Sequence, residues 1–326
     1  MSLLPSLGLS AVMAVVALPT ANTDLALDIR TAAGASTIVV GPGRPVQYQL
    51  IGTLSNASAS DGLAYFSTNL AFSGGPLSQA ASPTGAPMTS FAAPLGFTNP
   101  AGFGGTVVGG ELRQVGGAQN TIRNTIAPSP NGAVLLGVAQ PSSPAVLATG
   151  GLVAPYQVGT FALTASGTRA NVILPGQTGL PFYRVDKVAN TNTSPLQVDV
   201  QAIRARPSVL SVTAGGAQTL SIDAGPNNAG RVYWCLGSIT GTSPGFVLPG
   251  GARMPLHPDG YLSYTINNPN SPILQNSQGV LDADGRGSVT FTPNRRFVGM
   301  TVHHAFYLPS PSLEFVSEAE PVQVVP

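Results

Sequence analysis

The pentapeptide Gly241-Thr-Ser-Pro-Gly245 has residue types and spacing that could carry catalysis. It fits the Gly-x-Ser-x-Gly pattern of a nucleophile elbow, in which a serine sits between a strand and a helix and the next residue donates its backbone N–H to an oxyanion. Here the next residue is Pro244, which has no N–H, and no helical pattern follows. The 13 acidic residues show no pair suited to glycoside hydrolysis. We therefore predict a surface turn, no catalytic residue and no enzyme.

Two adjacent histidines, His303 and His304, are the next candidates for chemistry, as metal ligands. They lie in an alternating strand pattern, where neighbouring side chains point to opposite faces of the sheet. The pair cannot chelate one ion, and only His257 remains as another histidine. We predict core or surface histidines and no metal site here.

The segment Asp282-Ala-Asp-Gly-Arg-Gly287 is similar to the first half of a calcium loop. Its twelfth position is Pro293, where such a loop needs glutamate. A tight Asp-Gly hairpin turn explains the same residues, and Asp259-Gly260 predicts a turn of the same kind. Asp282 and Asp284 are kept as candidate calcium ligands, the only cofactor that the sequence suggests.

Four aromatic residues could form a platform on which a sugar stacks: Tyr233, Trp234, Tyr261 and Tyr264. Tyr233 and Trp234 are neighbours in an alternating strand pattern, so one of the two must face the core. Core packing is the favoured interpretation, and a binding role for the four rings is the alternative.

Short β-branched runs separated by Gly, Pro, Asn or Asp repeat along the chain, whereas amphipathic helical patterns are nearly absent. Strict alternation, as in Val46–Leu50 and Leu196–Val200, indicates one buried and one solvated face. The pattern predicts an all-β chain of two antiparallel β-sandwich domains, of jelly-roll or Ig-like type. Strands are expected at Ser36–Val40, Val46–Leu50, Tyr156–Ala165, Leu196–Val200, Ser208–Thr213, Gln218–Ile222, Arg231–Leu236, Gly287–Thr292, Thr301–Tyr307 and Pro321–Val325.

The domain organisation is predicted from the segments rich in Gly and Pro that separate these runs. Residues 71–155 are dense in Gly, Pro, Ser and Ala and predict long loops, with one short helix at 118–126. Pro207 interrupts two strand-like runs, and residues 208–222 predict a fresh hairpin. We expect an N-terminal apolar segment at 1–21, a first domain at 22–205 and a smaller second domain at 206–326.

Composition limits the partners of the chain. Charged residues make up 8% of it and the net charge is +1, while 43% of the residues are hydrophobic. The 13 arginines and the single lysine, Lys187, are scattered, so no basic stripe could track nucleic acid. A weakly charged surface of this kind repels copies of itself poorly and suits a protein that associates or works outside the cell.

The N-terminal residues support export. Leu3–Leu18 is an apolar stretch of the length of a signal h-region, followed by small residues, and it is too short for a membrane span. Cleavage would leave no stable membrane span, and a buried strand or helix is the alternative. The single cysteine, Cys235, allows no intrachain disulfide.

Two stretches of the chain carry family resemblances. Residues Ile38–Asn56, Gly62–Leu70 and Ala148–Thr164 resemble cohesin-like domains, which implies a jelly-roll sandwich of about nine strands. Residues 71–145 depart from that pattern, no binding residue matches, and the dockerin-binding role of cohesins is not carried over. Residues Tyr233–Gly245, Met254–Gly260, Asn276–Gly287 and Leu308 resemble a C-terminal module of secreted planctomycete-type bacterial proteins, which implies export from a bacterium and no chemistry.

These observations together predict a secreted, non-catalytic protein of a bacterial surface or extracellular matrix, a structural subunit that forms filaments or layers with itself. The alternative is a carbohydrate- or protein-binding module of an extracellular assembly. Expected partners are copies of the chain, other extracellular proteins or glycans.

Overall fold

The computed structural model describes residues 22–57, 61–74, 77, 104–118, 137, 139–174, 184–309 and 315–326. Strands dominate this part of the chain, and the predicted all-β class is confirmed. None of the helices described is long and apolar enough to cross a membrane. The predicted export segment at 1–21 and residues 119–126 of the predicted helix lie outside the described ranges, while Ala118 ends a strand.

The N-terminal sandwich consists of two sheets. Sheet A has the strand order β10-β1-β3-β7, and sheet B has the order β2-β11-β8-β4-β6-β5, with β9 beside β8. Most pairs are antiparallel, but β1 with β10 and β2 with β11 are parallel. The strands are β1 (Asp24–Thr31), β2 (Thr37–Val40), β3 (Pro45–Ser55), β4 (Gly62–Phe72), β5 (Gly104–Val108), β6 (Glu111–Ala118), β7 (Ala145–Val153), β8 (Gly159–Leu174), β9 (Arg184–Lys187), β10 (Thr191–Ser194) and β11 (Leu196–Val200).

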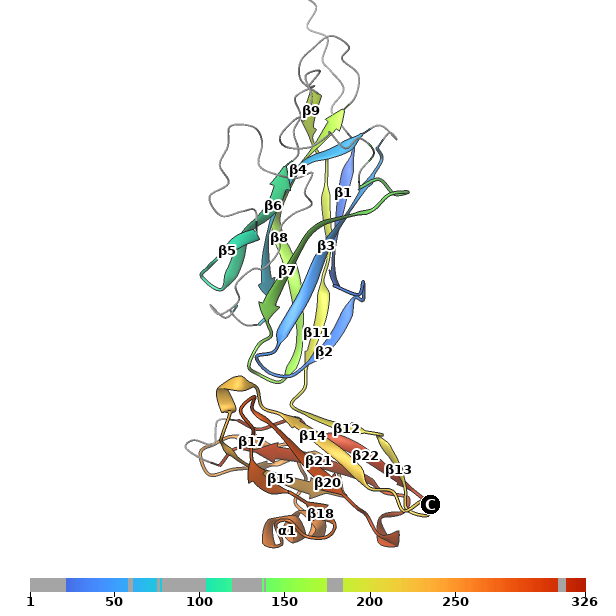
Figure 1. Cartoon of the computed structure of the whole chain (residues 1–326), viewed down its shortest axis with the longest axis vertical. Coiled ribbons are helices and arrows are strands. Elements are labelled where there is room, and N and C mark those ends of the chain that lie inside the picture. Colours follow the sequence, from blue (N-terminus) through green and yellow to red (C-terminus); the bar gives the residue numbers. More distant parts are fainter. Residues whose placement is uncertain are drawn as a thin grey trace, which may run out of the picture.

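The C-terminal sandwich follows the first end to end (Figure 1). Sheet C has the order β12-β14-β20-β18, and sheet D has the order β13-β22-β21-β15-β19. A two-stranded ribbon, β16-β17, and one helix lie between β15 and β18 in the chain, and 3₁₀ turns occur at Pro226–Asn228 and Arg295–Phe297. The elements are β12 (Ile203–Arg206), β13 (Val209–Ser211), β14 (Gln218–Asp223), β15 (Val232–Ser238), β16 (Phe246–Val247), β17 (Arg253–Met254), α1 (Gly260–Asn267), β18 (Leu274–Gln275), β19 (Gln278–Val280), β20 (Arg286–Phe291), β21 (Thr301–Tyr307) and β22 (Glu320–Val325).

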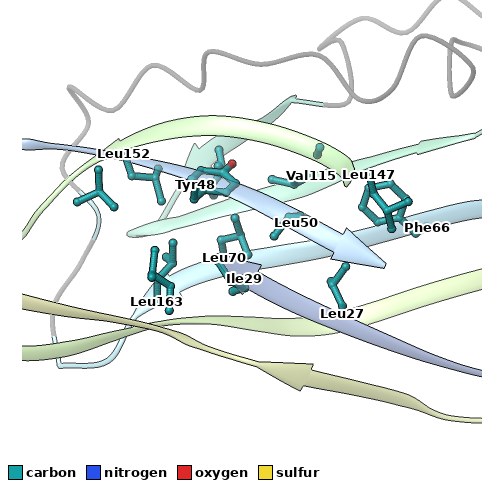
Figure 2. Close-up of a cluster of buried hydrophobic side chains, with 14 of the residues drawn as sticks. Leu27, Ile29, Tyr48, Leu50, Phe66, Leu70, Val115, Leu147, Leu152 and Leu163 are labelled. Carbon is teal, nitrogen blue, oxygen red and sulfur yellow. The ribbon is translucent and has the colours of Figure 1, made fainter. Parts of the chain in front are cut away.

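The first core is built by alternation. In β1 and β3 every second side chain is buried, and Figure 2 shows Ile29, Tyr48 and Leu50 meeting Leu70 and Leu163 from sheet B. Full burial of each aliphatic side chain contributes about 1.5–3 kcal/mol. A separate buried cluster, from Ala202 to Val324, fills the second sandwich.

A tyrosine lies over a glycine on the neighbouring strand in both sandwiches. Tyr48 pairs with Gly150, and Tyr233 pairs with Gly279. A Cβ added at Gly150 would lie 2.5 Å from the Tyr48 hydroxyl oxygen, and one at Gly279 would lie 2.7 Å from that of Tyr233. These glycines are therefore required by the packing of the aromatic rings.

Two local predictions are wrong. Residues 208–222 do not form a hairpin, because β13 pairs with β22 in sheet D and β14 pairs with β20 in sheet C. Asp259-Gly260 is not a hairpin turn: Asp259 is the N-cap of α1, and its carboxylate accepts the backbone N–H of Leu262 at 2.8 Å. The domain boundary at 205/206 remains a proposal. Because β12, which begins at Ile203, pairs with β14 of the second sandwich, the pairing favours a boundary a few residues before 205.

Candidate interaction surfaces

The Gly241–Gly245 motif lies in the loop between β15 and β16. The peptide bond between Ser243 and Pro244 is cis, and the next element along the chain is the short strand β16. The serine therefore does not have the strand–turn–helix setting of a nucleophile elbow.

The two histidines of β21 face different surroundings. His304 is fully buried among aromatic rings, 4.7 Å from Phe291 between ring centroids, and its Nε2 lies 3.4 Å from the Tyr261 hydroxyl. Burial, and to a lesser extent the neighbouring His303, lowers the pKa of His304 to about 3. No group of three or more metal-ligating side chains occurs among the residues that the structure describes.

Asp282 and Asp284 lie in the turn between β19 and β20. The Asp282 carboxylate accepts the backbone N–H groups of Asp284 and Arg286, at 2.9 and 2.8 Å, which is the local bonding of a tight turn. These hydrogen bonds and the nearby arginines lower the pKa of Asp282. Arg44 from the first sandwich donates to the backbone carbonyl of Asp284 at 2.7 Å, so a cation side chain already occupies this turn.

The four aromatic candidates do not share one surface. Tyr233 and Tyr261 are buried, and the Tyr233 hydroxyl donates to the backbone carbonyl of Asn276. Trp234 packs against Tyr307 on the other face of β15, while Tyr264 stacks on Tyr261. The arrangement places two of the rings in the second core instead of on a common platform.

The exposed valines of the chain gather on the outermost strands of the sheets. In the described ranges seven valines are between 37% and 64% exposed, and six of them lie on edge strands of the two sandwiches. They are Val39 on β2, Val108 on β5, Val146 on β7, Val185 on β9, Val209 on β13 and Val280 on β19; the seventh, Val247, lies on the ribbon strand β16.

Five of these edge strands contain no charged residue: β2, β5 and β7 of the first sandwich, and β13 and β19 of the second. Edge strands carry unpaired N–H and C=O groups, and proteins commonly protect them with lysine, proline or very short length. β7 is nine residues long, and a bulge near Leu50 and Ile51 interrupts its register with β3 at one end. The sequence pattern did not identify which strands form these edges, although runs such as Thr37–Val40 carry a signal in their uninterrupted β-branched residues.

A crevice also opens on the first sandwich, beside β8. It has a volume of about 490 Å³ and is lined by residues 168–171 and 187–191 together with Tyr65. No local sequence pattern indicates this crevice beyond the position of the single lysine, Lys187.

The comparisons with known proteins yield no family. No family model matches the chain, and no curated protein sequence does. A non-cellulosomal cohesin from Archaeoglobus fulgidus is 11% identical with a TM-score of 0.26, and the match covers 54% of this chain and 91% of that one. The major pilin of Streptococcus agalactiae, as a 35 kDa C-terminal fragment, is 9% identical with a TM-score of 0.25, covering 93% and 91%.

An Actinomyces fimbrial adhesin is 10% identical with a TM-score of 0.24, and the match covers 93% of this chain and 98% of that one. These structural neighbours are a cohesin, a pilin and an adhesin subunit, but a likeness at such scores carries no argument about kinship or function. The resemblance of the C-terminal residues to a planctomycete-type module is not supported by these comparisons.

Proposed function

We propose that the chain is an exported, non-catalytic structural subunit of a bacterial surface or extracellular matrix, which associates with copies of itself through its sheet edges. The observation that carries this proposal is the placement of the exposed valines, since six of the seven lie on edge strands of the two sandwiches. An incoming strand would gain main-chain hydrogen bonds from such an edge and apolar contact from the valine side chains.

The low charge of the chain supports the same proposal. With a net charge of +1 and 8% charged residues, two copies meet little electrostatic repulsion as they approach. Strands β2, β5 and β7 contain no charged side chain that would be buried, at a cost in free energy, when another strand pairs with them.

The proposal is tested by electron microscopy and sedimentation of the purified protein, wild type and variants. Lysine is introduced singly at Val39, Val108 and Val146, which lie on the uncharged edge strands β2, β5 and β7 of the first sandwich. The side chains are exposed, so the fold tolerates lysine there. At least one variant is expected to reduce assembly about tenfold or more, because a charge would be buried at the new interface.

The matched control is Val247→Lys. Val247 is 60% exposed but lies on the two-stranded β16-β17 ribbon, which belongs to none of the four sandwich sheets, and its replacement is expected to leave assembly unchanged. The proposal would be contradicted if the wild-type protein stayed monomeric at millimolar concentration. It would also be contradicted if the extent of assembly were equal in all four variants. Export is checked separately by the intact mass of the mature protein, which should lack about 20 residues if the N-terminal segment is cleaved.

A further inference from the structure

The crevice beside β8 forms where the chain leaves one sheet for the other. β9 pairs with β8 in sheet B, and only a few residues later β10 pairs with β1 in sheet A. Val188 still donates its backbone N–H to the Ala170 carbonyl of β8 at 3.2 Å, whereas Ala189 donates to Thr23 at 2.7 Å. The chain therefore leaves β8 after Val188, and a space of about 490 Å³ lies beside β8. This volume lies in the range of sites for small organic ligands and is larger than a simple ion needs.

One row of side chains crosses the crevice on a single face of sheet B. Tyr65 on β4 is directly opposite Asn171 on β8, and Asn171 is directly opposite Lys187 on β9. Residues directly opposite in a sheet point to the same face, and residues two apart along a strand do so as well. Arg169 therefore joins this face, which gathers a phenol ring, an amide and two cations.

The two cations have no acidic partner in the part of the chain that the structure describes. The Asp186 carboxylate pairs with Arg184 at 3.3 Å, and the Asp24 carboxylate accepts the side-chain amides of Asn56 and Asn190 at 3.0 and 2.7 Å. Neither carboxylate is paired with Arg169 or Lys187, so the crevice carries an excess of positive charge in a chain that has little charge elsewhere.

We propose that this crevice binds an acidic sugar, a hexuronate unit of an extracellular polysaccharide. Its carboxylate would lie between Arg169 and Lys187, which supply charge-assisted hydrogen bonds. The Tyr65 ring offers an apolar face to the C–H groups of the sugar, and the Asn171 amide can bond its hydroxyl groups. The combination of a ring, an amide and two cations in one crevice favours a sugar acid over a bare anion.

The test is a titration of the full chain with D-galacturonate, followed by saturation-transfer NMR. Galactose and inorganic phosphate serve as probes of the sugar and of the negative charge alone. Arg169→Gln and Lys187→Gln are each expected to weaken galacturonate binding about three- to tenfold, and the double variant more than tenfold. Arg295→Gln, an exposed arginine of the second sandwich, is the matched control and should bind as the wild type does.

The proposal is supported if galacturonate binds at least tenfold more tightly than galactose and phosphate, and if the double variant loses that preference. It is overturned if the wild type shows no saturable binding of galacturonate, or if phosphate binds equally well, which would reveal an anion site with no sugar specificity. Equal binding by the double variant would also overturn it. The measurement uses dispersed protein and does not depend on self-association. Its result can therefore support or contradict the sugar site independently of the assembly proposed above.

Discussion

The guanidinium of Arg44 forms a forked ion pair with the carboxylate of Asp223, 179 residues further along the chain. Nε lies 2.9 Å from Oδ2 and Nη2 lies 2.8 Å from Oδ1, and the side chains are only 14% and 23% exposed. The pair joins the loop before β3 in the first sandwich to the end of β14 in the second. The hydrogen bond and charge of Asp223 raise the pKa of Arg44 against the opposing effect of burial.

Replacing Arg44 with glutamine is expected to lower the free energy of unfolding by about 1–3 kcal/mol, because the half-buried Asp223 carboxylate would lose its forked partner and keep only the longer ion pair with Arg286 at 3.7 Å. Arg44→Lys should restore only part of the lost free energy of unfolding, since an ammonium group cannot form the two parallel hydrogen bonds that the guanidinium makes to the carboxylate. Denaturant unfolding followed by the fluorescence of Trp234, the single tryptophan, measures the loss. Small-angle X-ray scattering should show a wider range of shapes in the glutamine variant.

Arg30→Gln is the matched control for this pair. Arg30 bonds Asp28 two residues away on the same strand at 3.2 Å, so its loss removes an ion pair without touching the junction. We expect a loss of about 1 kcal/mol or less and unchanged scattering. Equal effects of the two glutamine variants would contradict a role of Arg44 in joining the sandwiches.

Gly285 is expected to be intolerant of any side chain. Its φ is +75°, and an added Cβ would lie 1.9 Å from the carbonyl oxygen of Gly225. Gly215→Ala is the control, because its φ of +66° is similar but no atom lies within 4 Å of its Cβ position. Thermal unfolding should show a loss of about 1–2 kcal/mol for Gly215→Ala and of about 3 kcal/mol or more for Gly285→Ala. Equal losses would show that the turn moves to accept the methyl group.

The strand pattern was predictable where burial alternates along one strand. All ten predicted strands lie where the structure has strands, and the bounds of β11 and β21 agree with the prediction. The helix α1 was missed because Asp-Gly begins hairpin turns as readily as Asp caps a helix, and the packing of Tyr261 into the second core decides between them. Very short strands such as β16 have too few residues to show a period.

The candidate surfaces were less predictable, because they depend on residues far apart in the chain. The Arg44–Asp223 pair joins loops whose local sequences carry no sign of one another. The crevice exists because β9 and β10 belong to different sheets, which no local pattern reveals. Alternation did separate His303 from His304, since that separation follows from the geometry of one strand.

The stability of the second sandwich is expected to fall as the pH falls from 6.5 towards 4, because of His304. Its folded pKa of about 3 lies below its ordinary value of 6.5, so the unfolded chain binds the proton first and protonation favours unfolding. The slope contributed by this one group approaches about 1.4 kcal/mol per pH unit. His304→Leu should flatten the dependence of the unfolding free energy on pH in this window.

Two carboxyl groups give a background that the variant shares with the wild type. Burial alone would raise the pKa of Asp259, but the hydrogen bonds that its carboxylate accepts from Leu262, Ser238 and their neighbours outweigh burial, so the pKa lies below the ordinary 3.8. The stability that Asp259 contributes is therefore lost only below pH 3.8. Burial raises the pKa of Glu318 above 4.5, which acts in the opposite direction to His304. The difference between variant and wild type isolates the histidine, and identical pH profiles would show that His304 is not buried as a neutral ring.

The buried side chain of Gln218 is expected to lower the free energy of unfolding. It is fully buried, and neither its side-chain nitrogen nor its side-chain oxygen has a hydrogen-bond partner in the described ranges. Gln218→Met removes the unpaired amide at similar volume and should raise the free energy of unfolding by about 1–2 kcal/mol. Gln140→Met is the counterpart, since the buried Gln140 amide donates to the Asp61 carbonyl at 2.8 Å, and it should lose about 1–2 kcal/mol. Denaturant unfolding of both variants gives the comparison. A loss at Gln218 equal to that at Gln140 would mean that buried water bonds the Gln218 amide, since such water satisfies polar groups inside cores.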